Sequence, residues 1–168
     1  MTLKYLYGQD ELVAGFVAAM IPWISARGFG PACKALGVVK EIDGRNELIA
    51  GLVFHTISEE AALIEISGAA LPGFYWATRE TLKLMHQIPF MQYGCQMVVM
   101  KTPVDNVGLI EQLSRLGYEL ILMPRIFGRD RDGMYCYLTY EAWMESFLCR
   151  RYKHHVIHSK QNIEKDAA

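Results

Sequence analysis

The sequence predicts a single mixed α/β domain, in which helices cover a sheet of antiparallel and parallel strands. Apolar residues recur at helical spacing in four segments, residues 9–21, 78–88, 104–116 and 140–151. Runs rich in β-branched residues lie between these segments, and a strand reached by a helical crossover pairs parallel to its predecessor. The chain of 168 residues, 52% hydrophobic and 21% charged, is long and apolar enough for one packed core.

The N-terminal half is predicted to hold one helix and an antiparallel meander. The helix over residues 9–21 is followed by Pro22, and a glycine-rich turn at residues 28–31 leads into the sheet. Asp43-Gly44 is a strong hairpin signal, because both positions of a two-residue turn favour positive φ. The three predicted strands are residues 35–42, 48–57 and 61–70.

In the C-terminal half, helices alternate with strands, which predicts crossover connections and local parallel pairing. The helix over residues 78–88 should end at Pro89, and the helix over residues 104–116 should end at Gly117, a suitable C-terminal cap. The remaining predicted elements are strands over residues 96–101, 119–127 and 134–139 and a last helix over residues 140–151.

Composition and charge argue against several classes of protein. The formal net charge is −1 and the isoelectric point about 6.5, so no global field draws the chain to nucleic acid or to an anionic membrane. The four cysteines form no pair at metal-ligand spacing, so we expect reduced thiols and no metal site. We find neither a signal peptide nor about 20 consecutive apolar residues, and therefore expect a cytoplasmic protein without membrane contact.

The last residues differ from the rest of the chain. We expect residues 1–150 to form the single domain and residues 151–168 to form a basic, poorly ordered tail that contains His154, His155 and His158. Such a tail could bind the phosphate backbone of a nucleic acid or an acidic partner, and a merely solubilising tail is the alternative.

The stretch from Asp105 to Tyr118 carries a family resemblance. Asn106 opens the predicted helix, which ends in Leu116-Gly117-Tyr118. This resembles the Asn-to-Gly-Phe/Tyr segment of the GNAT (Gcn5-related N-acetyltransferase) superfamily, and the similarity extends in element order over residues 38–139. Three further motifs look like those of GNAT-like proteins carried by phages and prophages, namely Glu65-Ile66-Ser67-Gly68-Ala69-Ala70, Gly94-Cys95-Gln96-Met97 and Gly128-Arg129-Asp130.

The resemblance implies a GNAT-like acyl-CoA N-acyltransferase fold with three α/β/α layers, and transfer of an acetyl group from acetyl-CoA to an amine. If a phage encodes the chain, it would act in the host cytoplasm. Where two parallel strands part, here residues 63–69 and 96–101, unpaired backbone groups form a ligand crevice. The pantetheine arm could add to a strand edge and the pyrophosphate could lie at a helix start. The implied cofactor-binding residues are Ser67, Gly68, Ala69, Gly73, Trp76, Ala77, Thr78 and Asn106.

The chain departs from the family pattern at two places. Residues 72–77 keep only the terminal alanine of the family's Gln/Arg-x-x-Gly-x-Gly/Ala phosphate loop. Leu113 stands where the family carries a tyrosine that protonates the departing thiolate. Another group would have to donate this proton, and the candidates are Tyr75, Tyr93, Tyr118 and water.

Acetyl transfer to an amine needs a base near the point where the strands part. Glu65 lies on the candidate strand and shares a face with Leu63 and Ser67, so we expect it to act as the base. A solvent-facing or arginine-paired glutamate is the alternative. His55, in the adjacent strand, is the second candidate, with an ordinary pKa near 6.5. A hydrogen-bonded, half-buried histidine is the alternative there.

The acceptor itself, a small-molecule or protein amine, cannot be identified from the sequence, and a homodimer stays open. Candidate substrate-binding residues are Tyr75, in an aromatic cluster, and Arg125, Arg129 and Asp130, which flank a hairpin that lies beside the acceptor entrance in this family's topology. A solvated turn with balanced charges is the alternative. The rival functions are a catalytically inactive GNAT-like phage structural or host-interaction protein and a nucleic-acid-modifying GNAT relative.

Overall fold

The computed structural model describes residues 3–24 and 28–149, and within them seven strands form one mixed sheet. The strands are β1 (Lys4–Leu6), β2 (Lys34–Ile42), β3 (Arg45–Ser58), β4 (Leu63–Ala70), β5 (Met97–Pro103), β6 (Glu119–Met123) and β7 (Gly133–Thr139). Their spatial order is β1-β2-β3-β4-β5-β7-β6, and only β4 and β5 pair in parallel. The predicted α/β class with one parallel pair is confirmed.

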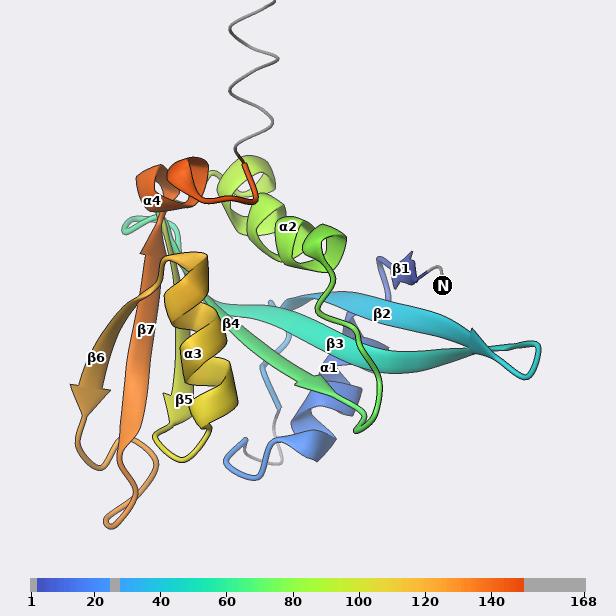
Figure 1. Cartoon of the computed structure of the whole chain (residues 1–168), viewed down its shortest axis with the longest axis horizontal. Helices are drawn as coiled ribbons and strands as arrows, with labels where there is room; N and C mark the ends of the chain where they lie inside the picture. The colour runs from blue at the N-terminus through green and yellow to red at the C-terminus, as the bar shows by residue number, and fades with distance from the viewer. Residues whose placement is uncertain (1–2, 25–27, 150–168) are drawn as a thin grey trace, which may run out of the picture.

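Helices cover both faces of the sheet, as the three-layer prediction requires (Figure 1). They are α1 (Asp10–Met20), α2 (Arg79–Gln87), a π-helical turn η1 (Ile88–Gln92), α3 (Val107–Leu116) and α4 (Tyr140–Glu145). Ile64 and Ile66 of β4 face the main core, which contains buried residues of α2, α3 and α4. On the opposite face, Val13 and Val17 of α1 pack against Val53 of β3.

Two glycines allow α1 to lie close to the sheet. Gly37 of β2 and Gly51 of β3 are directly paired across the two strands. A Cβ atom at Gly51 would lie 2.7 Å from Val17 Cγ2 and 2.9 Å from Val13 Cγ1, far inside van der Waals contact. The absence of side chains at this pair therefore determines how near the helix can approach.

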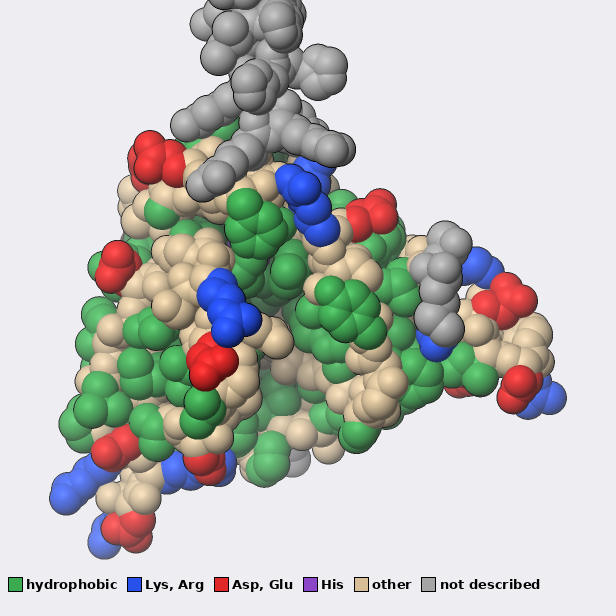
Figure 2. All heavy atoms as spheres, in the orientation of Figure 1, with side chains coloured by type: hydrophobic (Ala, Val, Ile, Leu, Met, Phe, Trp, Pro, Cys, Tyr) green, Lys and Arg blue, Asp and Glu red, His purple; other side chains and the backbone are tan. Residues whose placement is uncertain are grey.

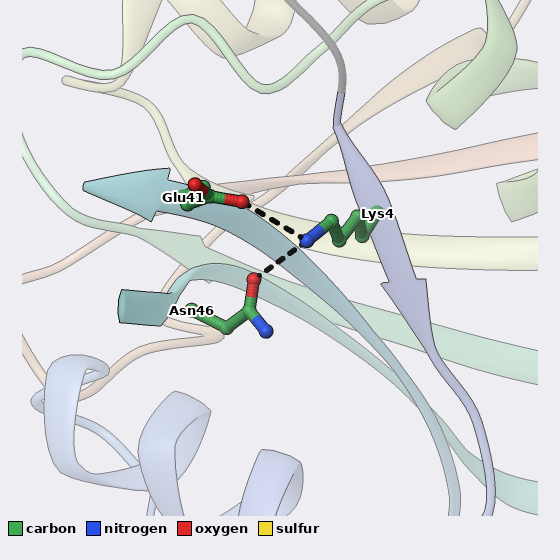
Figure 3. A network of polar contacts seen from close by, with 3 residues as sticks. All are labelled: Lys4, Glu41 and Asn46. Carbon is green, nitrogen blue, oxygen red and sulfur yellow. Dashed lines mark hydrogen bonds and ion pairs between the residues drawn. The ribbon is translucent and has the colours of Figure 1, made fainter. Parts of the chain in front are cut away.

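The β2–β3 hairpin is long and projects from the body of the molecule (Figure 1). Asp43 and Gly44 have φ values of 49° and 77°, so the predicted tight turn with two positive-φ residues is confirmed. Near the turn, Lys4 Nζ donates to Glu41 Oε2 at 3.3 Å and to Asn46 Oδ1 at 2.9 Å (Figure 3). This network fastens β1, a strand too short for the sequence pattern to reveal.

The α-helix predicted over residues 78–88 is confirmed, since α2 ends at Gln87, just before Pro89. The chain then continues in a wider π-helical turn that was not predicted, in which the Tyr93 N–H donates to the Ile88 carbonyl. The strand predicted over residues 119–127 ends at Met123. Pro124 follows without an N–H to donate, and Arg125 has a φ of 60°.

Two helices are shorter than predicted. The helix predicted over residues 104–116 begins only at Val107, because the Asn106 N–H closes a turn on the Pro103 carbonyl. The helix predicted over residues 140–151 ends at Glu145, where Ser146 adopts an extended conformation with ψ of 162°. The predicted tail, residues 151–168, lies outside the described residues.

The four cysteines, at positions 33, 95, 136 and 149, are free and buried. Among residues 3–24 and 28–149, no group of three His, Cys, Asp or Glu side chains gathers where it could hold a metal ion. No helix in this part of the chain combines the length and apolar character needed to cross a membrane.

A buried polar pair connects α2 with the segment that follows α3. His86 is fully buried, its Nδ1 lies 2.7 Å from the Leu82 carbonyl oxygen and its Nε2 lies 2.9 Å from the Tyr118 hydroxyl. The carbonyl can only accept, so Nδ1 carries the proton and Tyr118 donates to Nε2. Burial lowers the pKa of His86 to about 4 and raises that of Tyr118.

We expect Gly51→Ala to lower the free energy of unfolding by about 1–3 kcal/mol, because the added methyl group would push α1 away from β3. Denaturant unfolding measures the difference. Gly15→Ala is the matched control in α1, since a Cβ atom there meets nothing within 4 Å. It should be neutral or slightly stabilising. Equal stability of wild type and Gly51→Ala would contradict this account of the helix position.

We also expect the buried imidazole to make stability depend on pH. The pKa of His86 is about 4 in the folded chain and near 6.5 when unfolded, so the unfolded chain binds the extra proton first on acidification. The free energy of unfolding should therefore fall between about pH 6.5 and pH 4, by on the order of 3 kcal/mol. The double variant His86→Leu/Tyr118→Phe removes both partners, so its free energy of unfolding should no longer show this fall with pH. Denaturant titrations at several pH values measure the free energy. Tyr118→Phe alone should keep this fall. An unchanged fall in the double variant would show that another group is responsible.

Candidate functional site

The two parallel strands part halfway along their length. β4 and β5 pair only through Leu63–Met97, Ile64–Val98 and Glu65–Val99. Beyond these pairs, β4 stays with β3 as far as Ala70, and β5 stays with β7 as far as Pro103. In Figure 1, β4 runs away from β5 on the side of β3, and β5 continues beside β7. The predicted strand divergence is confirmed.

A cavity of about 250 Å³ occupies the opening, and we call it the strand crevice. Its walls come from residues 20–23 at the end of α1 and just after it, residues 66–70 of β4, residues 100–102 of β5, Asn106 just before α3 and Leu109 of α3. In the described chain, no strand pairs with the β5-facing edge of β4 beyond Glu65. The crevice is therefore bordered by strand edges that can form backbone hydrogen bonds with an extended ligand.

Four of the residues predicted to bind the cofactor lie at this crevice. Ser67, Gly68 and Ala69 form its β4 wall, and Asn106 lies across it at the start of α3. The Asn106 side chain makes no capping hydrogen bond and is exposed, so it can contact a ligand. Thr102 adds a buried hydroxyl whose Oγ1 has no hydrogen-bond partner in the described structure.

A second cavity of about 220 Å³ lies between α2 and α3, and we call it the helix cavity. Figure 2 shows the surface hollowed between these two helices. Tyr75 and Ala77 line it from the loop before α2, and Gln112 and Arg115 line it from α3. Tyr75 is 80% exposed, which leaves its ring available to a ligand.

Gly73, Trp76 and Thr78, which were also predicted to bind the cofactor, each have a structural role. Gly73 has a φ of 81° and a Cβ atom there would meet nothing, so its backbone conformation is what requires glycine. Trp76 packs against the core clusters. Thr78 caps α2, because its hydroxyl accepts from the Thr81 N–H at 3.2 Å.

Glu65, the first candidate base, forms an ion pair across the parting strands. Its Oε2 lies 2.9 Å from Lys101 Nζ on β5, and the side chains are 12% and 35% exposed respectively. Glu65 is thus a nearly buried carboxylate with a cationic partner, which differs from both sequence-based alternatives, solvent exposure and pairing with arginine. Lys101 lines the strand crevice, and it is the only charged side chain among the described residues that do.

His55, the second candidate base, is paired with Glu65 across β3 and β4. Its Nε2 lies 2.9 Å from Ser67 Oγ and its Nδ1 lies 2.9 Å from Thr56 Oγ1. Burial lowers the pKa of His55, the Glu65 carboxylate opposes this shift and the Lys101 ammonium adds to it. The imidazole is therefore neutral at pH 7. It lies beside Glu65 on the neighbouring strand and is hydrogen-bonded to Ser67.

The turn between β6 and β7 approaches the end of α1. Trp23 packs edge-to-face on Phe127, with ring centroids 4.9 Å apart, and Arg131 lies 5.3 Å above the Trp23 ring. Arg131 also pairs with Asp105 at 3.4 Å. These contacts place the Trp23 wall of the crevice against the hairpin.

The predicted substrate-binding residues of this hairpin lie outside the crevice wall. Arg125, Arg129 and Asp130 are exposed and do not line either cavity. The Arg125 N–H donates to Asp132 Oδ1 at 2.8 Å, which stabilises the turn. Acceptor binding by these three residues stays a prediction.

The candidate proton donors lie in different environments. Leu113 is 1% exposed within the main core. Tyr118 is buried, it donates to His86, and burial raises its pKa, so its proton is held in the core. Tyr75 lines the helix cavity and Tyr93 is 44% exposed.

Sequence reasoning did not single out Lys101, Trp23 or Arg115. One signal was available for Lys101, because it is the only charged residue in the otherwise uncharged run Met97–Pro103. A lone cation in an interior strand calls for a partner or a ligand. Trp23 and Arg115 carry no comparable local signal, since their neighbours come from distant parts of the chain.

A wider groove of about 770 Å³ runs along α1 between Asp10 and Lys34. It is larger than the strand crevice, but it lies away from the parting of β4 and β5. The volume of a cavity therefore does not by itself identify the candidate site. The strand edges, the Glu65–Lys101 pair and the unpartnered Thr102 hydroxyl all identify the strand crevice instead.

Comparison with solved structures establishes the fold. A SpeG mutant, the spermidine N-acetyltransferase of Vibrio cholerae, matches with a TM-score of 0.69 and 14% identity over 84% of this chain and 96% of that chain. A dodecameric structure of the same enzyme matches with a TM-score of 0.65 and 15% identity over 85% and 95%. A putative acetyltransferase matches with a TM-score of 0.59 and 17% identity over 75% and 68%. The chain thus has the fold of GNAT acetyltransferases.

Sequence comparisons add no closer relative. No family model matches the chain, and no curated protein matches it.

The position of Lys101 predicts how His55 titrates. The Lys101 ammonium lowers the pKa of His55 and the Glu65 carboxylate raises it, so Lys101→Met should shift this pKa upward. NMR titration of the imidazole measures the shift. Lys4→Met is the matched control, because Lys4 also pairs with a glutamate but lies in the distant network of Figure 3. A pKa of His55 that stays constant in Lys101→Met would show that the two side chains are not coupled.

Proposed function

We propose that this protein is an acetyl-CoA-dependent N-acetyltransferase that acetylates an amine in the strand crevice. The parting of β4 and β5 carries this proposal, because it opens a cavity bordered by strand edges in a GNAT fold. The neighbouring solved structures include enzymes that acetylate spermidine, although their low identity limits the likeness to the fold.

The residues around the two cavities fit the chemistry of coenzyme A. The pantetheine arm carries amide groups, and the free edge of residues 66–70 offers backbone partners for them. Asn106 and the buried Thr102 hydroxyl provide further hydrogen bonds. The first turn of α2 attracts anions through its N–H groups, and Arg115, which pairs with Glu111 at 3.6 Å, lines the helix cavity.

Acetyl-CoA would supply an acetyl group activated as a thioester. Glu65 is the proposed base, and it would take a proton from the acceptor nitrogen as this nitrogen attacks the acetyl carbon. The new C–N bond replaces the C–S bond, and the departing thiolate takes a proton from water or from Tyr75. The neutral His55 and its partner Ser67 provide a second route for the proton.

The buried Leu113 supports one alternative, a GNAT fold that binds a ligand or partner without catalysis. Nucleic-acid modification through the tail stays a prediction, as do phage origin and a cytoplasmic location. Self-association also stays a prediction. Ile121, Leu122 and Met123 of the edge strand β6 are 41–56% exposed and provide a surface for it.

Two measurements test the proposal. Calorimetry should detect acetyl-CoA binding to the full chain, and thiol release should require an added amine. Glu65→Gln should lower kcat by about 100-fold and leave the acetyl-CoA affinity unchanged, because the amide keeps the shape but accepts no proton. Glu41→Gln is the matched control, since Glu41 also pairs with a lysine, far from the crevice (Figure 3). It should behave as wild type.

The outcomes separate the alternatives. No binding of acetyl-CoA at millimolar concentration would reject the proposal. Binding without amine-dependent thiol release would favour the non-catalytic scaffold. Full activity of Glu65→Gln would move the role of base to His55.

A further inference from the structure

The Glu65–Lys101 pair lies where β4 and β5 part, at the edge of the strand crevice. Glu65 is the last residue of β4 that pairs with β5, and its strand partner is Val99. Lys101 lies two residues beyond Val99 on β5, where the strands have parted. The two charged groups are 2.9 Å apart. Lys101 lines the crevice and the Glu65 side chain behind it is 12% exposed, so a ligand that displaces Lys101 can reach the carboxylate.

A bound amine must compete with Lys101 for the carboxylate. A simple alkylammonium would give Glu65 a new partner, but it would leave the Lys101 ammonium without one and add a second positive charge beside it. An acceptor that also carries a carboxylate avoids this cost, because its carboxylate binds Lys101 while its amine faces Glu65.

We propose that the acceptor is a small zwitterionic amine, such as an amino acid, and that Lys101 selects it by binding its carboxylate. This inference rests on the proposed acetyl-transfer function. The exchange of partners also releases Glu65 from Lys101 at the moment when the amine needs a base, so recognition and activation are coupled.

The remaining walls agree with a small acceptor of this charge. Among the described residues that line the crevice, Lys101 is the only one with a charged side chain, and its carboxylate partner is Glu65. A polycation such as the spermidine of the SpeG enzymes would find no second carboxylate there. His55 is neutral, and the charge of Arg131 is balanced by Asp105. Trp23 lines the crevice, whose volume of about 250 Å³ limits the acceptor to a small molecule.

The experiment compares each acceptor with a matched molecule that lacks the negative charge. Proteinogenic amino acids, their carboxamides and spermidine are offered to the full chain with acetyl-CoA, and kcat/KM is measured by thiol release. At least one amino acid should exceed its own carboxamide and spermidine by about tenfold or more. Lys101→Met should lose this preference, and Lys101→Glu should reverse it in favour of spermidine. Lys4→Glu, which changes the distant pair of Figure 3, should keep the wild-type preference.

A binding measurement provides a readout that does not need catalysis. The preferred amino acid, titrated without acetyl-CoA, should shift the NMR signals of the His55 imidazole in wild type, and the carboxamide should not. Thermal unfolding of each variant verifies that it is folded. Should Lys101→Glu fail to fold, Lys101→Met carries the test.

The outcomes test the zwitterionic acceptor separately from the proposed acetyltransferase function. Failure to bind acetyl-CoA would reject the enzyme itself. Turnover with equal rates on acid and carboxamide, or with spermidine preferred by wild type, would overturn the zwitterionic acceptor and leave the acetyltransferase intact. Acetyl-CoA binding without turnover of any amino acid would overturn it as well.

Discussion

The parting of two parallel strands is the constraint on which the rest of the structure depends. β4 and β5 share three pairs of residues, and each then follows an antiparallel partner, β3 or β7. β4 is paired with β3 over most of its length and β5 is paired with β7 throughout, so the opening leaves the two inner edges unpaired. Those edges would destabilise the fold if they were buried without partners, but they border a cavity that water or a ligand can fill.

Helices on both faces keep this opening in place. α1 lies against the N-terminal strands because Gly37 and Gly51 leave room for it, and the segment after it carries Trp23 to the hairpin between β6 and β7. On the other face α3 starts at the crevice with Asn106, and α2 is joined to the end of α3 by the buried His86–Tyr118 pair. The packing of distant elements thus determines the width of the opening.

The strand crevice has few charged side chains, and the position of the Glu65–Lys101 pair determines their effect on a ligand. Glu65 and Lys101 come from the two separating strands, so their contact bridges the region where backbone pairing has ended. A nearly buried carboxylate requires such a partner, and the partner in turn limits which ligands can approach. The pair stabilises the empty site, and under the function proposed above it would also discriminate between acceptors.

The sequence by itself determined the element order, the Asp43-Gly44 hairpin, the parallel pair and the segment at Ser67–Ala69 and Asn106, because these follow from local periodicity, turn chemistry and a family resemblance. It misplaced the strand end near Pro124 and missed both the π-helical turn after α2 and the strand β1, where local signals are weak or are overridden by packing. Only the tertiary structure decided that Glu65 meets Lys101, that Trp23 meets Arg131 and that Arg115 lines the helix cavity. Such contacts join residues 36 to more than 100 positions apart in the chain, and no local pattern encodes which cation or ring will face a given side chain.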